Sequence, residues 1–219
     1  ENVPRIACFS LAPTRTFISF PASSNTTLIW GGVALQFGDV VFHSPGERAH
    51  QWTKRASTWG LASLPSEQFS TYGKALTGLE LTAPPVSRVL RPLPSAISRL
   101  RRLHASACRL AETRPEIHAH TEVVRAIEQE YIHALISCLT AKDAYGNLVI
   151  KRRQEDIVLK FEDVLRDHAN QTLSVRKVCA ALGVTYQALR LSCADVLGVS
   201  SSRYIRLKRN VAGDATALC

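Results

Sequence analysis

The residues whose types and spacing best fit a chemical task lie near the C-terminus, in a segment with the pattern of two short helices joined by a glycine turn. Ser174 is a suitable N-cap for the first helix, and Gly183 follows that helix where a left-handed residue would close it. Thr185 can cap the second helix. The second helix has one apolar stripe at four-residue spacing, which we expect to bury against the first helix: Leu189, Cys193 and Leu197.

The opposite face of the second helix carries Tyr186, Gln187, Arg190 and Leu191. Arginine can pair in a bidentate manner with guanine, and glutamine with adenine, when a helix lies in the major groove of DNA. The pattern therefore predicts a helix-turn-helix that reads base edges. An ordinary helical hairpin in a protein core is the alternative that this periodicity leaves open.

The pattern Leu-Ser-Val…Cys-Ala-Ala-Leu-Gly-Val-Thr…Leu-Gly-Val-Ser…Arg-Tyr-Ile-Arg-Leu-Lys-Arg, from Leu173 to Arg209, resembles the first helix-turn-helix of the AraC-type bacterial transcription regulators. The resemblance implies that double-stranded DNA is the partner. It places Gln187, Arg190 and Leu191 toward the bases, with Tyr186 beside them. Phosphate contacts are implied for three further residues, Thr185, Arg203 and Arg206.

The chain also departs from the AraC-type pattern. Family members usually carry Arg at the positions of Gln187 and Leu191, Phe at Cys193 and Pro at Ser201. After Arg209 the long basic connecting helix and the second helix-turn-helix are missing, so we expect only the first of the two subdomains. One such module binds DNA weakly, so stable binding requires either the missing second half or a dimer with two copies, and we expect a homodimer.

Composition points to a polyanionic partner and a reducing compartment. The formal net charge is +9, and the stretch from Lys151 onward holds 12 Lys or Arg against 7 Asp or Glu. Six cysteines occur without a CxxC pair, which favours free thiols in the cytoplasm. We expect no membrane span, since the apolar run of residues 27–42 is broken by Gly, Gln and Asp, and no signal peptide. The absence of methionine, even at position 1, suggests a fragment.

The residues before the helix-turn-helix predict an α+β fold in three parts. Short β-branched and aromatic runs make residues 1–93 a β-rich domain, which the resemblance identifies as a cupin-like or jelly-roll sensor. The expected strands are residues 15–20, 27–30, 33–37, 40–43 and 59–65. A small-molecule effector could bind there, with four aromatic residues as its lining: Trp30, Phe42, Trp52 and Trp59.

Helical periodicity begins at Pro94 and lasts to Thr140, which predicts a hairpin of two helices. Their apolar stripes could pack on the β domain, on each other or on a second subunit, and the AraC-type resemblance implies that they form a dimer interface. Residues 141–152 have weak periodicity and are expected to be a linker. Residues 153–219 then form the partial, homeodomain-like helix-turn-helix domain, with a supporting helix from Arg153 to His168.

No motif predicts a cofactor, a metal site or an enzyme. The spacing of His43, Glu47 and His50 lacks the His-x-His of cupin metal sites, and residues 118 and 120 point apart on a helix. Glu130 and His133 match one Glu-x-x-His pair, but a di-metal site needs two. The sequence also lacks GxSxG, P-loop and GxGxxG motifs.

We therefore expect a cytoplasmic transcription factor of AraC type, responsive to an effector. A truncated sensor or dimerisation protein that no longer binds DNA stably is the alternative, and a cupin-type enzyme is a distant third. Salt-dependent binding to DNA separates the first two.

Overall fold

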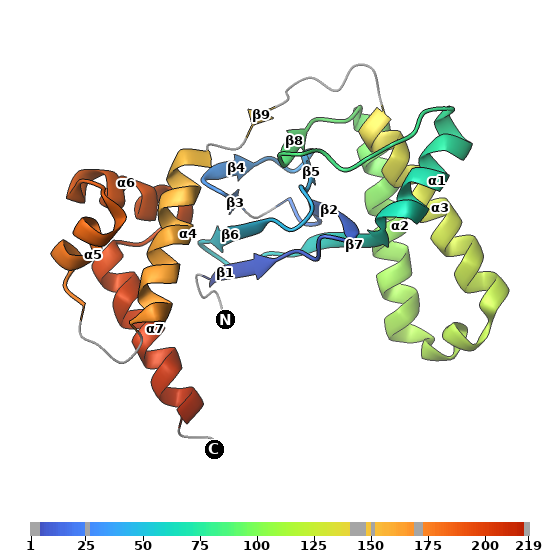
Figure 1. Cartoon of the computed structure of the whole chain (residues 1–219). Coiled ribbons are helices and arrows are strands. Elements are labelled where there is room, and N and C mark those ends of the chain that lie inside the picture. Colours follow the sequence, from blue (N-terminus) through green and yellow to red (C-terminus); the bar gives the residue numbers. More distant parts are fainter. Residues whose placement is uncertain (1–4, 25–26, 141–147, 150–151, 169–172, 217–219) are drawn as a thin grey trace.

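The computed structural model describes residues 5–24, 27–140, 148–149, 152–168 and 173–216. In this part of the chain two antiparallel sheets stand between two groups of helices (Figure 1). The first sheet has the order β1-β6-β3-β4, formed by Arg5–Ser10, Arg48–Thr53, Leu28–Trp30 and Val33–Leu35. The second has the order β7-β2-β5-β8-β9, formed by Trp59–Pro65, Arg15–Pro21, Val40–Phe42, Arg88–Leu90 and Leu148–Val149.

One group of helices packs on the second sheet and the other on the first sheet (Figure 1). The first group consists of α1 (Ser66–Thr77), α2 (Pro94–Thr113), a short 3-10 helix (Pro115–Ala119) and α3 (Thr121–Thr140). The second group consists of α4 (Arg152–Asp167), α5 (Val175–Leu182), α6 (Tyr186–Leu197) and α7 (Ser201–Thr216).

Three apolar clusters hold these layers together. Between the sheets, Trp30 and Leu28 of β3 meet Val41 of β5 and Val89 of β8. The outer face of the second sheet packs its apolar residues on α1 to α3, and this is the largest cluster. The third cluster joins α4 to α7, and Ile6 of the first sheet packs against it.

The mixed helix and sheet content confirms the coarse fold prediction, and strands lie within all five runs expected from the sequence. Sequence reasoning missed β1, β6, β8 and helix α1. The expected linker falls mainly on residues 141–147 and 150–151, which lie outside the described residues, although Leu148–Val149 within it pairs with β8. Residues 217–219 also lie outside the described part.

Candidate nucleic-acid interface

Helices α5 and α6 have the end groups that the sequence predicts. The Ser174 hydroxyl accepts a hydrogen bond from the Lys177 amide at 3.3 Å, and the Thr185 hydroxyl accepts one from the Ala188 amide at 3.1 Å. Gly183 is left-handed, with φ of 63°, and closes α5. Gly198 closes α6 in the same way, with φ of 67°. These local signals confirm the two helix boundaries, because caps satisfy the amide and carbonyl groups that a helix end leaves unpaired.

The apolar stripe of α6 is buried, but its partners differ from the expected ones. Leu189, Cys193 and Leu197 have no exposed area. They belong to one cluster with Val158 and Phe161 of α4, as well as with residues of α5 and α7. The prediction that the stripe buries only against the preceding helix was wrong, because α4 is the larger support for α6. Burial of Cys193 raises its thiol pKa to about 12, so this cysteine is a neutral core residue.

The N-terminal half of α6 remains free on its other face. Tyr186 is 59% exposed and Leu191 is 44% exposed, and Gln187 and Arg190 are exposed as well. The structure thus places all four predicted base-facing residues on the solvent side. Thr185 is exposed but its hydroxyl caps α6, while Arg203 and Arg206 are exposed on α7.

The chain segment that contains α5, α6 and the start of α7 is strongly basic. The segment from Ser174 to Arg209 contains seven Lys or Arg residues and a single acidic residue, Asp195. The Asp195 carboxylate accepts a hydrogen bond from the Gln154 side-chain amide at 2.8 Å. Because Asp195 faces α4 in this contact, it neutralises little of the positive charge of this segment. Such a charge distribution favours a phosphate backbone as the partner.

The C-terminal end of α6 is docked on the first sheet. Trp52 of β6 donates its indole N–H to the Asp195 carbonyl at 3.0 Å. A Cβ atom on Gly198 would lie 2.7 Å from the Trp52 ring, and a Cβ atom on Gly32 would lie 3.6 Å from Val196. The sheet therefore holds the end of α6 opposite to the free end that carries Gln187 and Arg190.

A polar cluster around Glu162 of α4 forms the second contact between the sheet and the helices. Glu162 Oε2 lies 3.3 Å from Cys8 Sγ of β1 and 3.1 Å from His50 Nε2 of β6. Its other oxygen, Oε1, accepts hydrogen bonds from the Tyr204 hydroxyl and from Lys208 Nζ, the latter at 2.8 Å. One carboxylate of α4 thus joins two strands to α7. Sequence reasoning missed this cluster.

The Glu162 environment keeps the carboxylate charged. Burial alone would raise the pKa of Glu162, but the contacts with His50, Lys208 and Tyr204 outweigh it and hold this pKa well below its usual range. Burial and the nearby Glu162 charge raise the pKa of the Cys8 thiol to about 11. Cys8 is therefore a protonated donor beside a carboxylate anion at neutral pH.

The four aromatic residues expected to line an effector pocket lie in different places. Trp30 is buried between the sheets, where it stacks on Phe9 at a centroid distance of 4.7 Å, and Trp59 stacks on the same Phe9 at 5.9 Å. Phe42 contacts Phe69 of α1 in the cluster on the other side of the second sheet. Trp52 faces α6. The structure brings Trp30 and Trp59 together but not the other two.

A buried Ser-His-Glu arrangement lies beside Trp30. Ser19 Oγ is 2.8 Å from His43 Nε2, and His43 Nδ1 is 3.8 Å from Glu47 Oε2. This order resembles a hydrolytic triad, but Ser19 is 3% exposed and His43 is 1% exposed. Glu47 also accepts a hydrogen bond from the Ser87 hydroxyl. These contacts make the group a structural network inside the sheets, since a substrate could not reach the serine.

The histidine spacings considered for metal binding do not converge. His43 faces the interior between the sheets, whereas His50 faces α4 from the opposite side of its sheet. Glu130 and His133 both contact Arg99 of α2, at 2.6 and 3.2 Å, which makes them a link between two helices. His120 is exposed, and the side chain of His118 lies outside the described residues.

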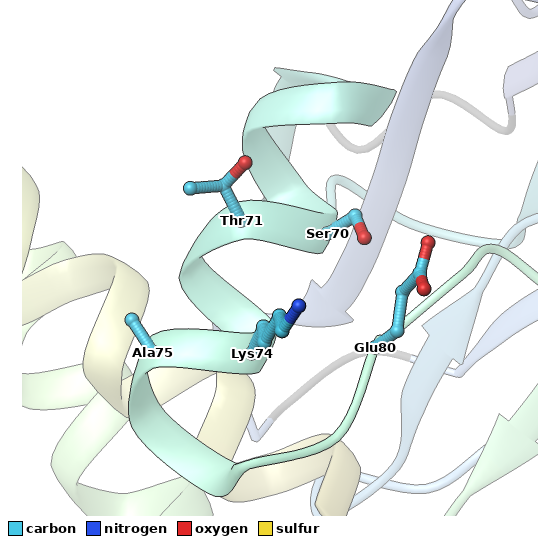
Figure 2. Close-up of a pocket in the computed structure, with 5 residues that line it drawn as sticks. All are labelled: Ser70, Thr71, Lys74, Ala75 and Glu80. Carbon is cyan, nitrogen blue, oxygen red and sulfur yellow. The ribbon is translucent and has the colours of Figure 1, made fainter.

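Two hollows lie on the helices that pack on the second sheet. One, of about 400 Å³, lies beside α1, where Ser70, Lys74 and Glu80 border the space between the helix and the segment that follows it (Figure 2). The other, of about 270 Å³, is an apolar groove between α2 and α3, lined mainly by Leu103, Ala107, Leu110, Ala126 and Ile127. Both are on the opposite side of the sheets from α6 (Figure 1).

No protein-family model matches this chain, and no curated protein matches its sequence. Within its described residues, no helix has the length and apolar character needed to cross a membrane. The chain is similar to the solved structure of the AraC-like transcriptional activator CuxR, with 15% identity and a TM-score of 0.40, over 95% of this chain and 73% of CuxR. It is also similar to ToxT from Vibrio cholerae with an unsaturated fatty acid bound, with 10% identity and a TM-score of 0.33, over 94% of this chain and 78% of ToxT. An apo ToxT variant gives 9% identity and a TM-score of 0.35, over 94% of this chain and 79% of that one.

Proposed function

We propose that this chain is a transcription regulator that binds double-stranded DNA through the free face of α6. The observation that carries the proposal is the exposed, capped N-terminal half of α6, which bears Gln187 and Arg190 and is held by its other end on the sheet. A supported helix with a free N-terminal face is the element that enters a major groove in helix-turn-helix proteins. The basic residues of the surrounding chain segment supply the contacts to phosphate.

Within this proposal the residues have separate tasks. Arg190 pairs with guanine and Gln187 with adenine, while Tyr186 and Leu191 make apolar contacts with the bases. Thr185, Arg203 and Arg206 contact phosphates, which fix the position of the protein without reading sequence. Affinity for all DNA then depends on the residues that contact phosphates, and sequence preference depends on Arg190 and Gln187.

Two substitutions test this division. After a preferred site has been selected from random duplexes, Arg190→Ala is expected to weaken binding to that site by about 5–150-fold, the equivalent of about 1–3 kcal/mol, and to leave binding to random DNA unchanged. Arg206→Ala is expected to weaken both, and to lower the slope of log affinity against log salt by about 1. Fluorescence anisotropy at several salt concentrations measures both effects.

Lys74→Ala is a matched control, since Lys74 is an exposed basic residue on α1, beyond the second sheet from α6 (Figure 1). It is expected to change neither affinity nor salt slope. Equal losses on selected and random DNA from Arg190→Ala would contradict its base contact. Absence of salt-dependent binding altogether would favour the alternative, a sensor or dimerisation protein without DNA binding.

We also propose that two copies of the chain bind DNA together as a dimer, and that a small-molecule effector changes their affinity for DNA. The apolar groove between α2 and α3, lined by half-exposed Leu103, Leu110 and Ile127, offers a surface for a second copy. The effector would bind between the sheets, where Trp30 Nε1 and His43 Nδ1 are buried without a hydrogen-bond partner among the described residues. Both side chains are only 1% exposed, so this binding requires the two sheets to separate. Sedimentation is expected to show two protein chains in the complex with DNA.

A metabolite screen tests the effector part of the proposal. If no compound changed the affinity of the protein for DNA, that part would be contradicted.

A further inference from the structure

Cys8, His50 and Glu162 bring together the three kinds of ligand atom that zinc prefers. Sγ, Nε2 and a carboxylate oxygen of these residues all lie within 4.8 Å of one another. The fold determines this meeting. Cys8 of β1 and His50 of β6 are direct partners in the antiparallel ladder, so both side chains leave the same face of the sheet, and α4 places Glu162 over that face.

The separations fit a tetrahedral ion. Bond lengths of about 2.3 Å from zinc to sulfur and about 2.0–2.1 Å to nitrogen and oxygen place neighbouring ligand atoms about 3.3–3.5 Å apart. Glu162 Oε2 is 3.3 Å from Cys8 Sγ and 3.1 Å from His50 Nε2. The third separation, between Cys8 Sγ and His50 Nε2, is at most 4.8 Å. A side-chain movement that brings it to about 3.5 Å would complete the geometry.

His50 provides an independent observation. Its side chain has no exposed area, and its two ring nitrogens are buried without a hydrogen-bond partner among the described residues. Nε2 lies 3.1 Å from Glu162 Oε2. A buried imidazole of this kind usually has a partner, and an ion between the three ligand atoms would satisfy Nε2.

Neighbouring residues orient the Glu162 carboxylate, and the site is accessible from solvent. Tyr204 and Lys208 hold Glu162 Oε1, so Oε2 is turned toward Cys8 and His50, as outer partners do in metal sites. Cys8 is exposed, which gives an ion access from solvent. Two anionic ligands, a thiolate and a carboxylate, balance the charge of a divalent ion even though Arg48 and Lys208 lie nearby.

We infer that Cys8, His50 and Glu162 form a binding site for a thiophilic divalent cation of the zinc class, at the junction of the first sheet with α4. Binding replaces the Cys8 S–H bond by a metal–sulfur bond and releases the proton to solvent, with no change in oxidation state. Solvent supplies the fourth ligand on the open side. The site does not depend on whether α6 binds DNA.

Cobalt(II) is the probe, because a cobalt–thiolate bond gives a charge-transfer absorption band that nitrogen and oxygen ligands do not give. Untagged full-length protein, stripped with a chelator, is expected to bind one Co²⁺ per chain with this band, and Zn²⁺ is expected to displace it. Cys8→Ser is expected to abolish the band and to weaken Zn²⁺ binding at least about 100-fold, since loss of an outer partner alone costs about 10–100-fold.

Cys108→Ser is the matched control, because Cys108 is the other exposed cysteine among the described residues. It is expected to retain the band and the affinity. Since Cys8 is exposed, metal-free Cys8→Ser is expected to unfold within a few degrees of the wild-type protein, which separates ligand loss from misfolding. A wild-type protein without the band, or a band that survives in Cys8→Ser, would overturn the site.

Discussion

Gly198→Ala is expected to lower the free energy of unfolding by about 2–5 kcal/mol. Two costs add together at this position. A left-handed φ of 67° costs a residue with a Cβ atom about 1–2 kcal/mol. The new Cβ atom would also lie 2.7 Å from the Trp52 ring, and overpacking of this kind costs about 1–3 kcal/mol. Urea denaturation measures the total.

Gly183→Ala is a matched control, because it measures the cost of the left-handed backbone alone. Gly183 has nearly the same φ, 63°, but no atom lies within 4 Å of its added Cβ position. Its substitution is expected to cost only about 1–2 kcal/mol. The difference between the two variants therefore measures the contact between β6 and the end of α6. Equal costs at the two glycines would show that Trp52 does not pack there in solution.

A double-mutant cycle with Trp52→Ala tests the same contact. When Trp52 is first replaced by Ala, the clash partner is gone, and Gly198→Ala is expected to cost no more than Gly183→Ala does. The coupling between residues 52 and 198 then equals the overpacking term, since residues in contact do not act additively. No coupling would mean that the cost arises within the helix end alone.

The two helices α5 and α6 were predictable because their signals are local. Ser174, Gly183 and Thr185 act through neighbours one to four residues away, and such caps follow from residue type and position. The apolar stripe of α6 was likewise evident from its spacing, which is why its burial was predicted correctly.

The partners of that stripe were not predictable in the same way. A supporting helix from Arg153 to His168 was expected from the AraC-type resemblance, and the structure has α4 at Arg152–Asp167. The spacing of the stripe alone did not indicate that α4, rather than α5, is its main partner. The contacts of strand β6 with the helices were not predictable for another reason. Its outward residues Arg48 and His50 have the polar character of a solvent face, but they lie against α4. Trp52 on the same face was expected to line a pocket, but it contacts α6.

The cluster around Glu162 was not predictable for both reasons: its members are far apart in the sequence, and they are polar residues that would ordinarily be exposed. Cys8 lies in a strand that the sequence did not indicate, and it is 154 positions from its hydrogen-bond partner Glu162. A carboxylate on the amphipathic helix α4 is ordinarily a solvated residue. Only the pairing of β1 with β6, together with the docking of α4, buries it beside a histidine. No periodicity or spacing could indicate such a site.

Glu162→Gln is expected to destabilise the metal-free protein by about 2–4 kcal/mol. Hydrogen bonds to a charged group contribute about 1.5–3 kcal/mol each, and removal of one member of a buried charged group costs about 3–5 kcal/mol. The lower range applies because Lys208 is 48% exposed and can regain water, and because the amide oxygen can still accept from Tyr204. Thermal or urea unfolding in the presence of a chelator measures the change.

Asp163→Asn tests whether burial, rather than charge alone, gives Glu162 its effect. Asp163 is the next residue on α4 and pairs with Arg48 at 2.9 Å and with Arg166 at 3.0 Å, but its side chain is 42% exposed. Partly exposed ion pairs contribute about 0–1 kcal/mol, so this variant is expected to change stability by less than about 1 kcal/mol. If both variants lost the same small amount, the Glu162 carboxylate would be solvated, and the helices would be held on the first sheet mainly by the contact of Trp52 with the end of α6.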